Sequence, residues 1–305
     1  PLSLRGGESL ATVVAQLERW AAAATDEGSG ASAALALGPP ARCAVETALA
    51  DAAARERGLP LHRLLGGPAA GDAAPAPVRC NATLTAGDPA EVLAQAEAWA
   101  ADGFRTFKLK LGPEGDAGQV AALRGGLGPE ARIRVDVNAT WTVGQAAAEL
   151  ARLAPFGLEL AEQPVAGLAA LAELRAASPV PLVADEAVTG PEEAAEAARL
   201  GACDAVTVKL SKIGSLDAGL GGHLPTYLSS ALDGPVGIAA AAHVAVGLSP
   251  APPWDDVDHG LATERLFAAT VAEQGPLLDG SRLAPPAGPG LGVTIDEAAL
   301  RSRRL

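Results

Sequence analysis

Short apolar runs alternate with helical stretches along most of this chain, and this alternation limits its fold more than any other feature. From residue 78 onward, runs of Val, Leu, Ile and Ala indicate strands, and stretches rich in Ala, Leu and Glu lie between most of them. Such alternation predicts a parallel sheet, and seven or eight units favour a closed (β/α)8 barrel. The predicted strands are residues 78–84, 106–112, 133–139, 158–164, 181–187, 205–211 and 225–231, with a weak eighth around 260–266.

The first part of the chain has a different character. Residues 8–25 predict an amphipathic helix, and residues 41–57 predict a second helix that ends before Pro60. A connector rich in Pro and Ala follows at residues 68–77 and is a candidate domain boundary. We therefore expect three parts, which are a partial, mostly helical domain over 1–76, a barrel over 77–282 and a C-terminal segment over 283–305. Because the chain begins at Pro1 and contains no Met, we expect its start to be truncated.

Composition excludes several classes of partner. The formal net charge of −13 argues against binding to a nucleic acid backbone or to an anionic membrane surface. The longest apolar stretch, residues 236–248, is too short to span a bilayer. Three cysteines without a CxxC pair predict no disulfide framework and fit a cytoplasmic location. The four histidines are not expected to act together, and the sequence carries no signal for an oligomeric state.

Charged residues fall at or near the ends of five consecutive predicted strands. They are Lys110, Asp136, Glu162, Asp185 and Lys209, and the separations are 26, 26, 23 and 24 residues, or one strand–helix unit each time. Because the carboxyl ends of barrel strands form a ring, we expect these side chains to meet at one mouth, where barrel enzymes carry out their chemistry.

Three carboxylates in a sheltered mouth would repel one another unless a cation lies between them. Oxygen ligands in this number suit Mg²⁺, and Mn²⁺ would also fit. Because no His lies on the strands that carry them, zinc is disfavoured. The sequence therefore predicts a magnesium site that binds a small-molecule carboxylate substrate.

Lysine is rare in this chain, because only four of the 23 basic residues are Lys. Arg does not exchange protons near neutral pH, whereas the pKa of Lys shifts readily, so a retained Lys suggests proton chemistry. Lys110 and Lys209 lie on the second and sixth strands, roughly opposite in a ring of eight. Lys108 points to the same side as Lys110, and its charge would lower the pKa of Lys110. We expect acid–base work on a C–H beside a carboxylate.

These residues resemble the enolase superfamily, in its muconate-lactonizing-like branch with a Lys-x-Lys motif on the second barrel strand. The resemblance covers nearly the whole chain, and it includes the sequence 61–67 (LHRLLGG) at the close of a capping domain and the tail 288–293 (GPGLGV). The matching motifs are Lys108-Leu109-Lys110, Asp136-Val137-Asn138, Glu162-Gln163-Pro164, Asp185-Glu186 and Val208-Lys209-Leu210. The resemblance implies a modified TIM-like barrel with a smaller α+β capping domain, which lacks its usual N-terminal strands here.

The resemblance also implies a role for each residue. Lys110 would abstract the proton and Lys209 would stabilise the enediolate from the opposite face, while Lys108 assists. The metal ligands would be Asp136, Glu162 and Asp185, and the residues that orient them would be Asn138, Gln163 and Glu186.

Within the superfamily the chain looks most like the o-succinylbenzoate synthases. Arg134 matches a basic residue of that group, and Ser229 and Ser230 match the strand that receives the substrate. The implied activity is a lyase reaction of menaquinone biosynthesis, the syn dehydration of a succinyl-hydroxycyclohexadiene-carboxylate to o-succinylbenzoate. The same residues would also serve an N-succinylamino acid racemase or a dipeptide epimerase. A non-catalytic binding barrel is a remote third interpretation.

Overall fold

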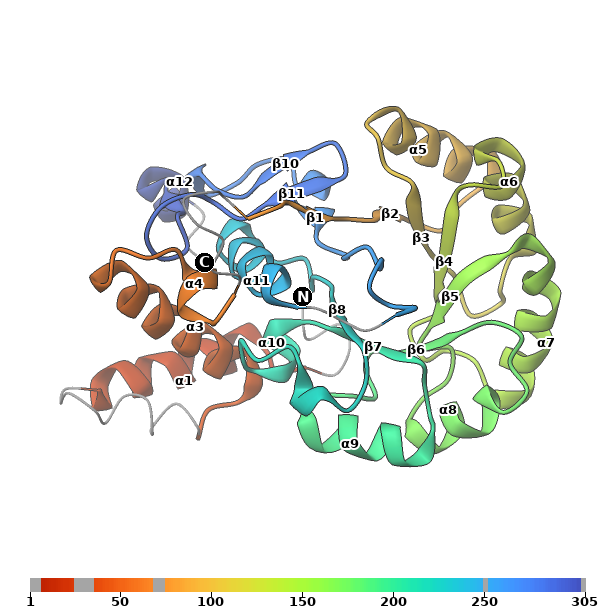
Figure 1. Cartoon of the computed structure of the whole chain (residues 1–305), viewed down its shortest axis with the longest axis horizontal. Coiled ribbons are helices and arrows are strands. Elements are labelled where there is room, and N and C mark those ends of the chain that lie inside the picture. Colours follow the sequence, from red (N-terminus) through yellow and green to blue (C-terminus); the bar gives the residue numbers. More distant parts are fainter. Residues whose placement is uncertain (1–6, 25–35, 68–74, 249–251, 303–305) are drawn as a thin grey trace.

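The computed structural model describes residues 7–24, 36–67, 75–248 and 252–302. Its central element is a seven-stranded parallel sheet in which each strand pairs with the next one along the chain. The sheet curls, and its helices lie along the outside (Figure 1). The strands are β2 (Ala82–Leu84), β3 (Thr106–Lys110), β4 (Arg132–Asp136), β5 (Leu158–Glu162), β6 (Leu182–Ala184), β7 (Ala205–Val208) and β8 (Thr226–Leu228).

An eighth segment joins the two edges of this sheet. The N–H of Gly260 donates to Leu228 O at 2.8 Å, and the N–H of Asn81 donates to His259 O at 2.9 Å. Two isolated parallel bridges accompany these bonds, Ser229 with Gly260 and Cys80 with His259. The ring is therefore closed in the way that the sequence predicts for a (β/α) barrel.

The sequence prediction placed the eighth strand wrongly. Only the short stretch ending at Gly260 pairs with its neighbours, whereas the predicted range 260–266 contains the 3-10 helix η4 (Ala262–Leu266). Strand seven of the prediction is also shorter than expected. It corresponds to β8, which ends at Leu228. The preceding strand, β7, ends at Val208, so that Lys209 is the N-cap residue of the short helix α10 (Leu210–Ile213).

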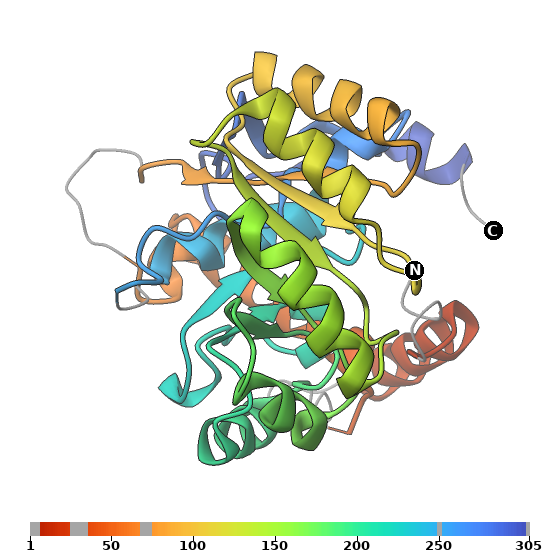
Figure 2. The same cartoon turned by 90° about the vertical axis from the view of Figure 1, so that its right-hand side faces the viewer.

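Helices cover the outside of the ring (Figure 2). In α7 (Val143–Leu153), the Thr142 hydroxyl accepts from the Gln145 N–H at 3.3 Å, which satisfies one of the free donors at the helix start. Its buried residues Ala146, Leu150 and Leu153 recur at helical spacing. The helices after β2–β6 and β8 are α5 (Pro89–Ala101), α6 (Ala117–Leu127), α7 (Val143–Leu153), α8 (Leu168–Arg175), α9 (Pro191–Leu200) and α11 (Pro235–Gly247), and the 3-10 turns η2 (Ala154–Phe156) and η3 (Leu220–Gly222) lie between elements.

The strands are buried on both faces, because helices cover one face and the barrel interior fills the other. Phe107 and Leu109 on β3 belong to the large core beneath the helices. Residues from four strands form a second apolar cluster, namely Leu160, Val183, Ala205 and Tyr227, with Trp254 and Val257 packed against it. This burial on both faces explains why the strand sequences are continuous apolar runs rather than alternating apolar and polar residues.

The N-terminal helices and the C-terminal segment lie side by side. The N–H of Leu61 donates to Gly290 O, and the N–H of Gly290 donates to Leu59 O, each at 2.8 Å. The helices here are α1 (Leu10–Ala23), α3 (Pro39–Glu56), α4 (Leu61–Leu64) and α12 (Glu297–Ser302). One small sheet contains β1 (Val78–Arg79), β10 (Leu277–Asp279) and β11 (Arg282–Ala284), and another contains β9 (Ala272–Gln274) and β12 (Thr294–Ile295). The domain limits near residues 76 and 283 stay predictions.

Two histidines meet at this junction, contrary to the expectation that the histidines do not act together. His62 of α4 and His243 of α11 are buried and stacked, with 3.1 Å between their Nδ1 atoms. His243 Nε2 lies 3.3 Å from Leu291 O in the C-terminal segment. The pair therefore links three parts of the chain that are far apart in the sequence.

The membrane and disulfide predictions concern the helices and the cysteines in the part of the chain that the structure describes. None of these helices is both long and apolar enough to cross a membrane. Cys43, Cys80 and Cys203 are buried, unpaired thiols.

Candidate active site

The predicted charged residues lie at one end of the ring. Asp136 is directly paired with Lys110 on one side and with Glu162 on the other. Asp185 and Lys209 each follow the last residue of their strand, β6 and β7. The strands that carry Lys110 and Lys209 are the second and sixth of eight positions, so the two lysines approach the carboxylates from opposite sides of the ring.

Lys108 lies between two of the carboxylates. Its ammonium donates to Glu162 Oε1 at 2.6 Å and lies 2.9 Å from Asp136 Oδ2. Lys110, two residues further along β3, donates to the same Asp136 oxygen and to Asn138 Oδ1 at 3.2 Å. Since the side chains of Asp136 and Glu162 are inaccessible to solvent, these contacts supply the compensation that buried carboxylates require.

Asp185 has two lysine partners, and one of them was not among the predicted site residues. Lys209 donates to Asp185 Oδ2, while Lys212 lies 2.9 Å from Asp185 Oδ1 and also donates to the main-chain carbonyl of Asp185. The rarity of lysine was the available signal for Lys212, because it is one of only four in the chain. Four ammonium groups therefore face three carboxylates, so lysines provide the positive charge that the sequence predicts for a metal ion.

The two opposed lysines differ in acidity. Burial lowers the pKa of Lys110, and the charge of Lys108 lowers it further, as the sequence predicted, so that it lies below its ordinary value. Burial also acts to lower the pKa of Lys209, but the Asp185 carboxylate outweighs it and raises this pKa. Lys110 is therefore the better proton acceptor of the two, and Lys209 is held as a cation.

The three carboxyl groups also differ from one another in pKa. Burial opposes ionisation of Asp136, but the charges of Lys108 and Lys110 hold its pKa well below the usual range. Asp185 is likewise held ionised by Lys212 and Lys209 against the effect of burial. For Glu162, burial and the two neighbouring carboxylates outweigh Lys108 and raise the pKa to about 7.

Backbone strain accompanies the residues predicted to orient the ligands. Asn138 and Gln163 have φ values of 51° and 39°, in the left-handed region that non-glycine residues rarely adopt. The Gln163 Oε1 accepts from the Asp185 N–H at 2.7 Å, which fixes the start of the loop that carries Asp185. The Asn138 amide donates to Glu186 Oε1 at 3.1 Å, so these predicted orienting residues contact one another.

Arg134 does not reach the open mouth. Its side chain is fully buried beneath Asp136, and its guanidinium bonds Glu159, Asn81 Oδ1 and the carbonyl of Asp258. These bonds stabilise the interior of the barrel. The predicted contact of Arg134 with a substrate stays a prediction.

Ser229 and Ser230 lie at the end of β8, next to the closing segment. The Ser230 hydroxyl accepts from the Asp233 N–H at 2.8 Å, so its oxygen is engaged in a turn. A Cβ at Gly260 would lie 2.6 Å from the Ser229 hydroxyl oxygen, so a larger residue at position 260 would displace that hydroxyl. Their role in substrate binding is a prediction that these contacts do not decide.

The donor set of this site fits Mg²⁺, since three buried carboxylates lie on adjacent strand ends and the buried Glu186 Oε2 has no hydrogen-bond partner. The side chains are nevertheless turned toward the lysines. Within the described residues, no three Asp, Glu, His or Cys side chains converge on one point. Binding of a divalent cation would therefore displace ammonium groups from these carboxylates.

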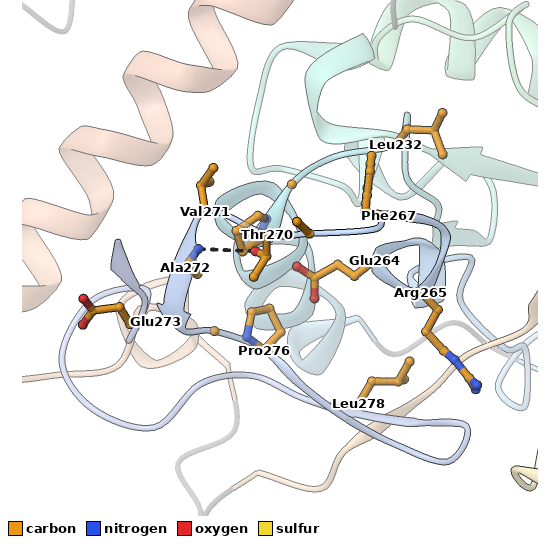
Figure 3. Close-up of a pocket in the computed structure, with 14 residues that line it drawn as sticks. Leu232, Glu264, Arg265, Phe267, Thr270, Val271, Ala272, Glu273, Pro276 and Leu278 are labelled. Carbon is orange, nitrogen blue, oxygen red and sulfur yellow. Dashed lines mark hydrogen bonds between the residues drawn. The ribbon is translucent and has the colours of Figure 1, made fainter. Parts of the chain in front are cut away.

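A pocket of about 670 Å³ lies beyond the ends of β8 and the closing segment (Figure 3). Leu232, Phe267 and Leu278 form part of its largely apolar wall. Glu264 projects into it, and its carboxylate makes no hydrogen bond or ion pair with the described residues, while burial raises its pKa. Arg265 points away and lies over the Trp99 ring, 4.4 Å from the ring centroid. Among the described residues, the pocket thus presents a carboxylate without a counter-ion.

The fold and this site define an enzyme of the enolase superfamily, and the chain belongs to that superfamily in its muconate-lactonizing-like branch. Residues 91–299 match the family described as enolase C-terminal domain-like.

Three similar proteins differ in their named activities. Muconate cycloisomerase 1 of Rhodococcus opacus is 34% identical, over 97% of this chain and 83% of that protein. The o-succinylbenzoate synthase of Mycobacterium ulcerans is 39% identical, over 75% of this chain and 70% of its own length. A substrate-liganded structure of the L-Ala-D/L-Glu epimerase from Bacillus subtilis superposes with a TM-score of 0.84 at 26% identity, covering 96% and 85% of the two chains. Lyase or isomerase chemistry of this superfamily is therefore supported, and the particular reaction is not fixed by similarity.

Proposed function

We propose that the chain is a Mg²⁺-assisted lyase that removes the proton beside a carboxylate and completes a syn dehydration to o-succinylbenzoate, in cytoplasmic menaquinone biosynthesis. The observation that carries this proposal is the opposed pair of lysines whose pKa values are shifted in opposite directions. The o-succinylbenzoate synthase relative, at 39% identity, supports the choice of substrate. The partner is a small-molecule carboxylate, and neither nucleic acid nor a membrane takes part.

In this reaction Lys110 is the proton acceptor. Its lowered pKa increases the fraction of neutral amine near pH 7, and it lies on the exposed side of the carboxylate row with 37% of its side chain accessible. Having taken the proton, the same ammonium returns it to the departing hydroxyl on the same face, which makes the elimination syn. Lys209 stays cationic on the opposite face and stabilises the enediolate charge.

Asp136, Glu162 and Asp185 would hold Mg²⁺, or Mn²⁺, and Asn138, Gln163 and Glu186 would orient them. The bound ion would neutralise the charge that develops on the substrate carboxylate.

The test is a turnover assay on the full chain with the succinyl-hydroxycyclohexadiene-carboxylate, in which the aromatic product is followed with Mg²⁺ and after EDTA. We expect turnover that EDTA abolishes and that Lys110→Arg lowers roughly 10²–10⁴-fold, because Arg keeps the charge but does not transfer the proton. The control is Arg199→Met on the exposed face of α9. Folded, Mg²⁺-loaded protein without turnover would overturn the lyase assignment.

A second candidate is proton transfer between the two faces of an α-carbon, as in an N-succinylamino acid racemase or a dipeptide epimerase. The carboxylate of Glu264, which meets no cation among the described residues, favours a substrate with an ammonium group, such as a dipeptide.

Incubation in D₂O with a dipeptide and with an N-succinylamino acid separates these substrates. Deuterium exchange with inversion on the dipeptide, reduced by Glu264→Gln, would favour epimerase activity. Exchange on neither substrate would remove this candidate, and exchange confined to the N-succinyl compound would remove the role of Glu264.

A further inference from the structure

Tyr227 is the only tyrosine of the chain, and it lies inside the barrel directly beneath the carboxylate row. It belongs to β8, and only 2% of its surface is accessible. Its ring packs with Leu160, Val183 and Ala205 from three other strands. A phenol at such a position needs a hydrogen-bond partner for its hydroxyl.

Glu162 accepts this hydrogen bond, and the Thr207 side chain is a second polar neighbour of the hydroxyl. The Tyr227 hydroxyl donates to Glu162 Oε2 at 3.2 Å, while Lys108 donates to the other oxygen, Oε1, at 2.6 Å. Burial, followed by the Glu162 charge, raises the pKa of Tyr227, so its oxygen keeps the proton that it donates. Both oxygens of Glu162 are therefore engaged, Oε1 by Lys108 of β3 and Oε2 by Tyr227 of β8.

The ring is itself held in place. The Arg134 guanidinium carbon lies 5.3 Å from the centroid of the Tyr227 ring, a distance at which a cation is attracted to the face of an aromatic ring. Arg134 is fixed in turn by a 2.7 Å bond to the Asp258 carbonyl and by its contact with Glu159. A continuous set of contacts thus connects the Asp258 carbonyl to Glu162 through Arg134 and Tyr227.

We propose that Tyr227 is a positioning residue, whose hydroxyl fixes the rotation of the Glu162 carboxylate so that Oε1 faces the cation site. The terminal torsion of a Glu side chain has a broad minimum, so a free carboxylate would sample many orientations. Fixing one oxygen from below reduces the entropy lost when the other oxygen coordinates a metal. This inference rests on the proposed Mg²⁺ site.

The first experiment is a calorimetric titration of the substrate-free full chain with Mg²⁺, for the native protein and for Tyr227→Phe. Phe keeps the ring against Arg134 and removes only the hydroxyl. We expect the dissociation constant for Mg²⁺ to rise roughly 10–100-fold, as for other partners of metal ligands. The matched control is Thr226→Val, which removes a hydroxyl from the adjacent residue on the opposite face of β8 and should leave the constant unchanged.

The outcomes separate the two proposals. If the native protein does not bind Mg²⁺, the metal site and this inference both fail. If Tyr227→Phe binds Mg²⁺ as tightly as the native protein, only the role of Tyr227 fails.

A second measurement does not depend on a variant that folds. Because Tyr227 is the only tyrosine, ¹³C label at the phenol carbon that bears oxygen gives a single NMR signal. We expect this signal to shift as Mg²⁺ is added, since the charge on Glu162 is then shared with the metal. A signal that stays in place while calorimetry records binding would overturn the proposal.

Discussion

Lys212 contacts Asp185 twice, at the carboxylate oxygen Oδ1 and at the main-chain carbonyl. It also donates to Thr207 O at 3.3 Å, so one ammonium joins the end of β6 to β7. Lys209 approaches the other carboxylate oxygen. Asp185 is therefore neutralised from both sides within the protein itself.

We predict that Lys212→Met lowers the free energy of unfolding of the metal-free protein by about 1–3 kcal/mol, because a buried carboxylate loses a charged partner. Saturating Mg²⁺ should raise the melting temperature more in this variant than in the native protein, since the ion supplies the missing charge. Thermal unfolding with and without Mg²⁺ measures both effects. An equal rise in the two proteins would contradict the idea that Lys212 and the metal compete for Asp185.

The acidity of Lys110 leads to a second prediction. The neutral amine is the proton acceptor, so kcat/KM should rise with pH up to the lowered pKa of Lys110. Lys108→Met removes a positive charge and leaves Asp136 with more uncompensated negative charge, and both changes favour the ammonium form of Lys110. The rising limb should therefore move to higher pH by roughly one unit or more. A pH–rate profile tests this, and a limb that stays in place would show that another group titrates.

The placement of the charged residues could be predicted from the sequence because it depends on local signals. Each strand is an apolar run that ends in a charge, and the near-constant spacing reports one strand–helix unit. In a closed parallel ring, these two facts suffice to bring Lys110, Asp136 and Lys209 to one mouth. The pairing register of β3 and β4 agrees with that expectation.

Contacts between distant segments could not be predicted in this way. The closing segment pairs through so few residues that it has no periodic pattern, and the predicted range therefore fell on η4. His62 and His243 are 181 positions apart, and nothing near either residue indicates the other. The hydrogen bond from Tyr227 to Glu162 depends on which strands face each other across the ring, which follows from the fold rather than from any motif.

Histidine protonation yields a third prediction. The pKa of His259 is lowered to about 4, first by burial and then by the charge of Arg134, and its Nδ1 accepts from the Leu228 N–H at 3.0 Å. Between pH 6.5 and about 4 the unfolded chain binds a proton that the folded protein excludes. The free energy of unfolding should therefore fall as pH drops through this window, by roughly 3 kcal/mol from His259 alone.

The His259→Gln variant isolates this contribution. Gln retains an acceptor for the Leu228 N–H but does not titrate, so urea unfolding of this variant should depend less on pH than that of the native protein below pH 6.5. Above that pH the two curves should run parallel. Curves that stay parallel down to pH 4 would rule out His259 as the titrating group.

The helical N-terminal region supports the opposite lysine, and this gives the last prediction. Arg42 of α3 donates to Gly214 O at 2.8 Å and to Ile213 O at 2.9 Å, at the carboxyl end of α10. Because α10 begins directly after Lys209, these bonds anchor the segment that carries both Lys209 and Lys212.

We expect Arg42→Ala to increase hydrogen exchange over residues 209–216 and to lower kcat, while exchange in β3 and β4 stays unchanged. Removal of two charge-assisted bonds should cost about 1.5–3 kcal/mol each in local stability. Gly214→Ala should have a similar effect by a different route, since its φ is 69° and a Cβ there would lie 2.7 Å from the Arg42 guanidinium. Arg42→Lys, which keeps the charge but can bond fewer carbonyls at once, should give an intermediate result. Unchanged exchange in all three variants would mean that the Arg42 bonds do not anchor α10, and that the bonds of Ser215 and Leu216 to Glu46 of α3 suffice to hold this segment.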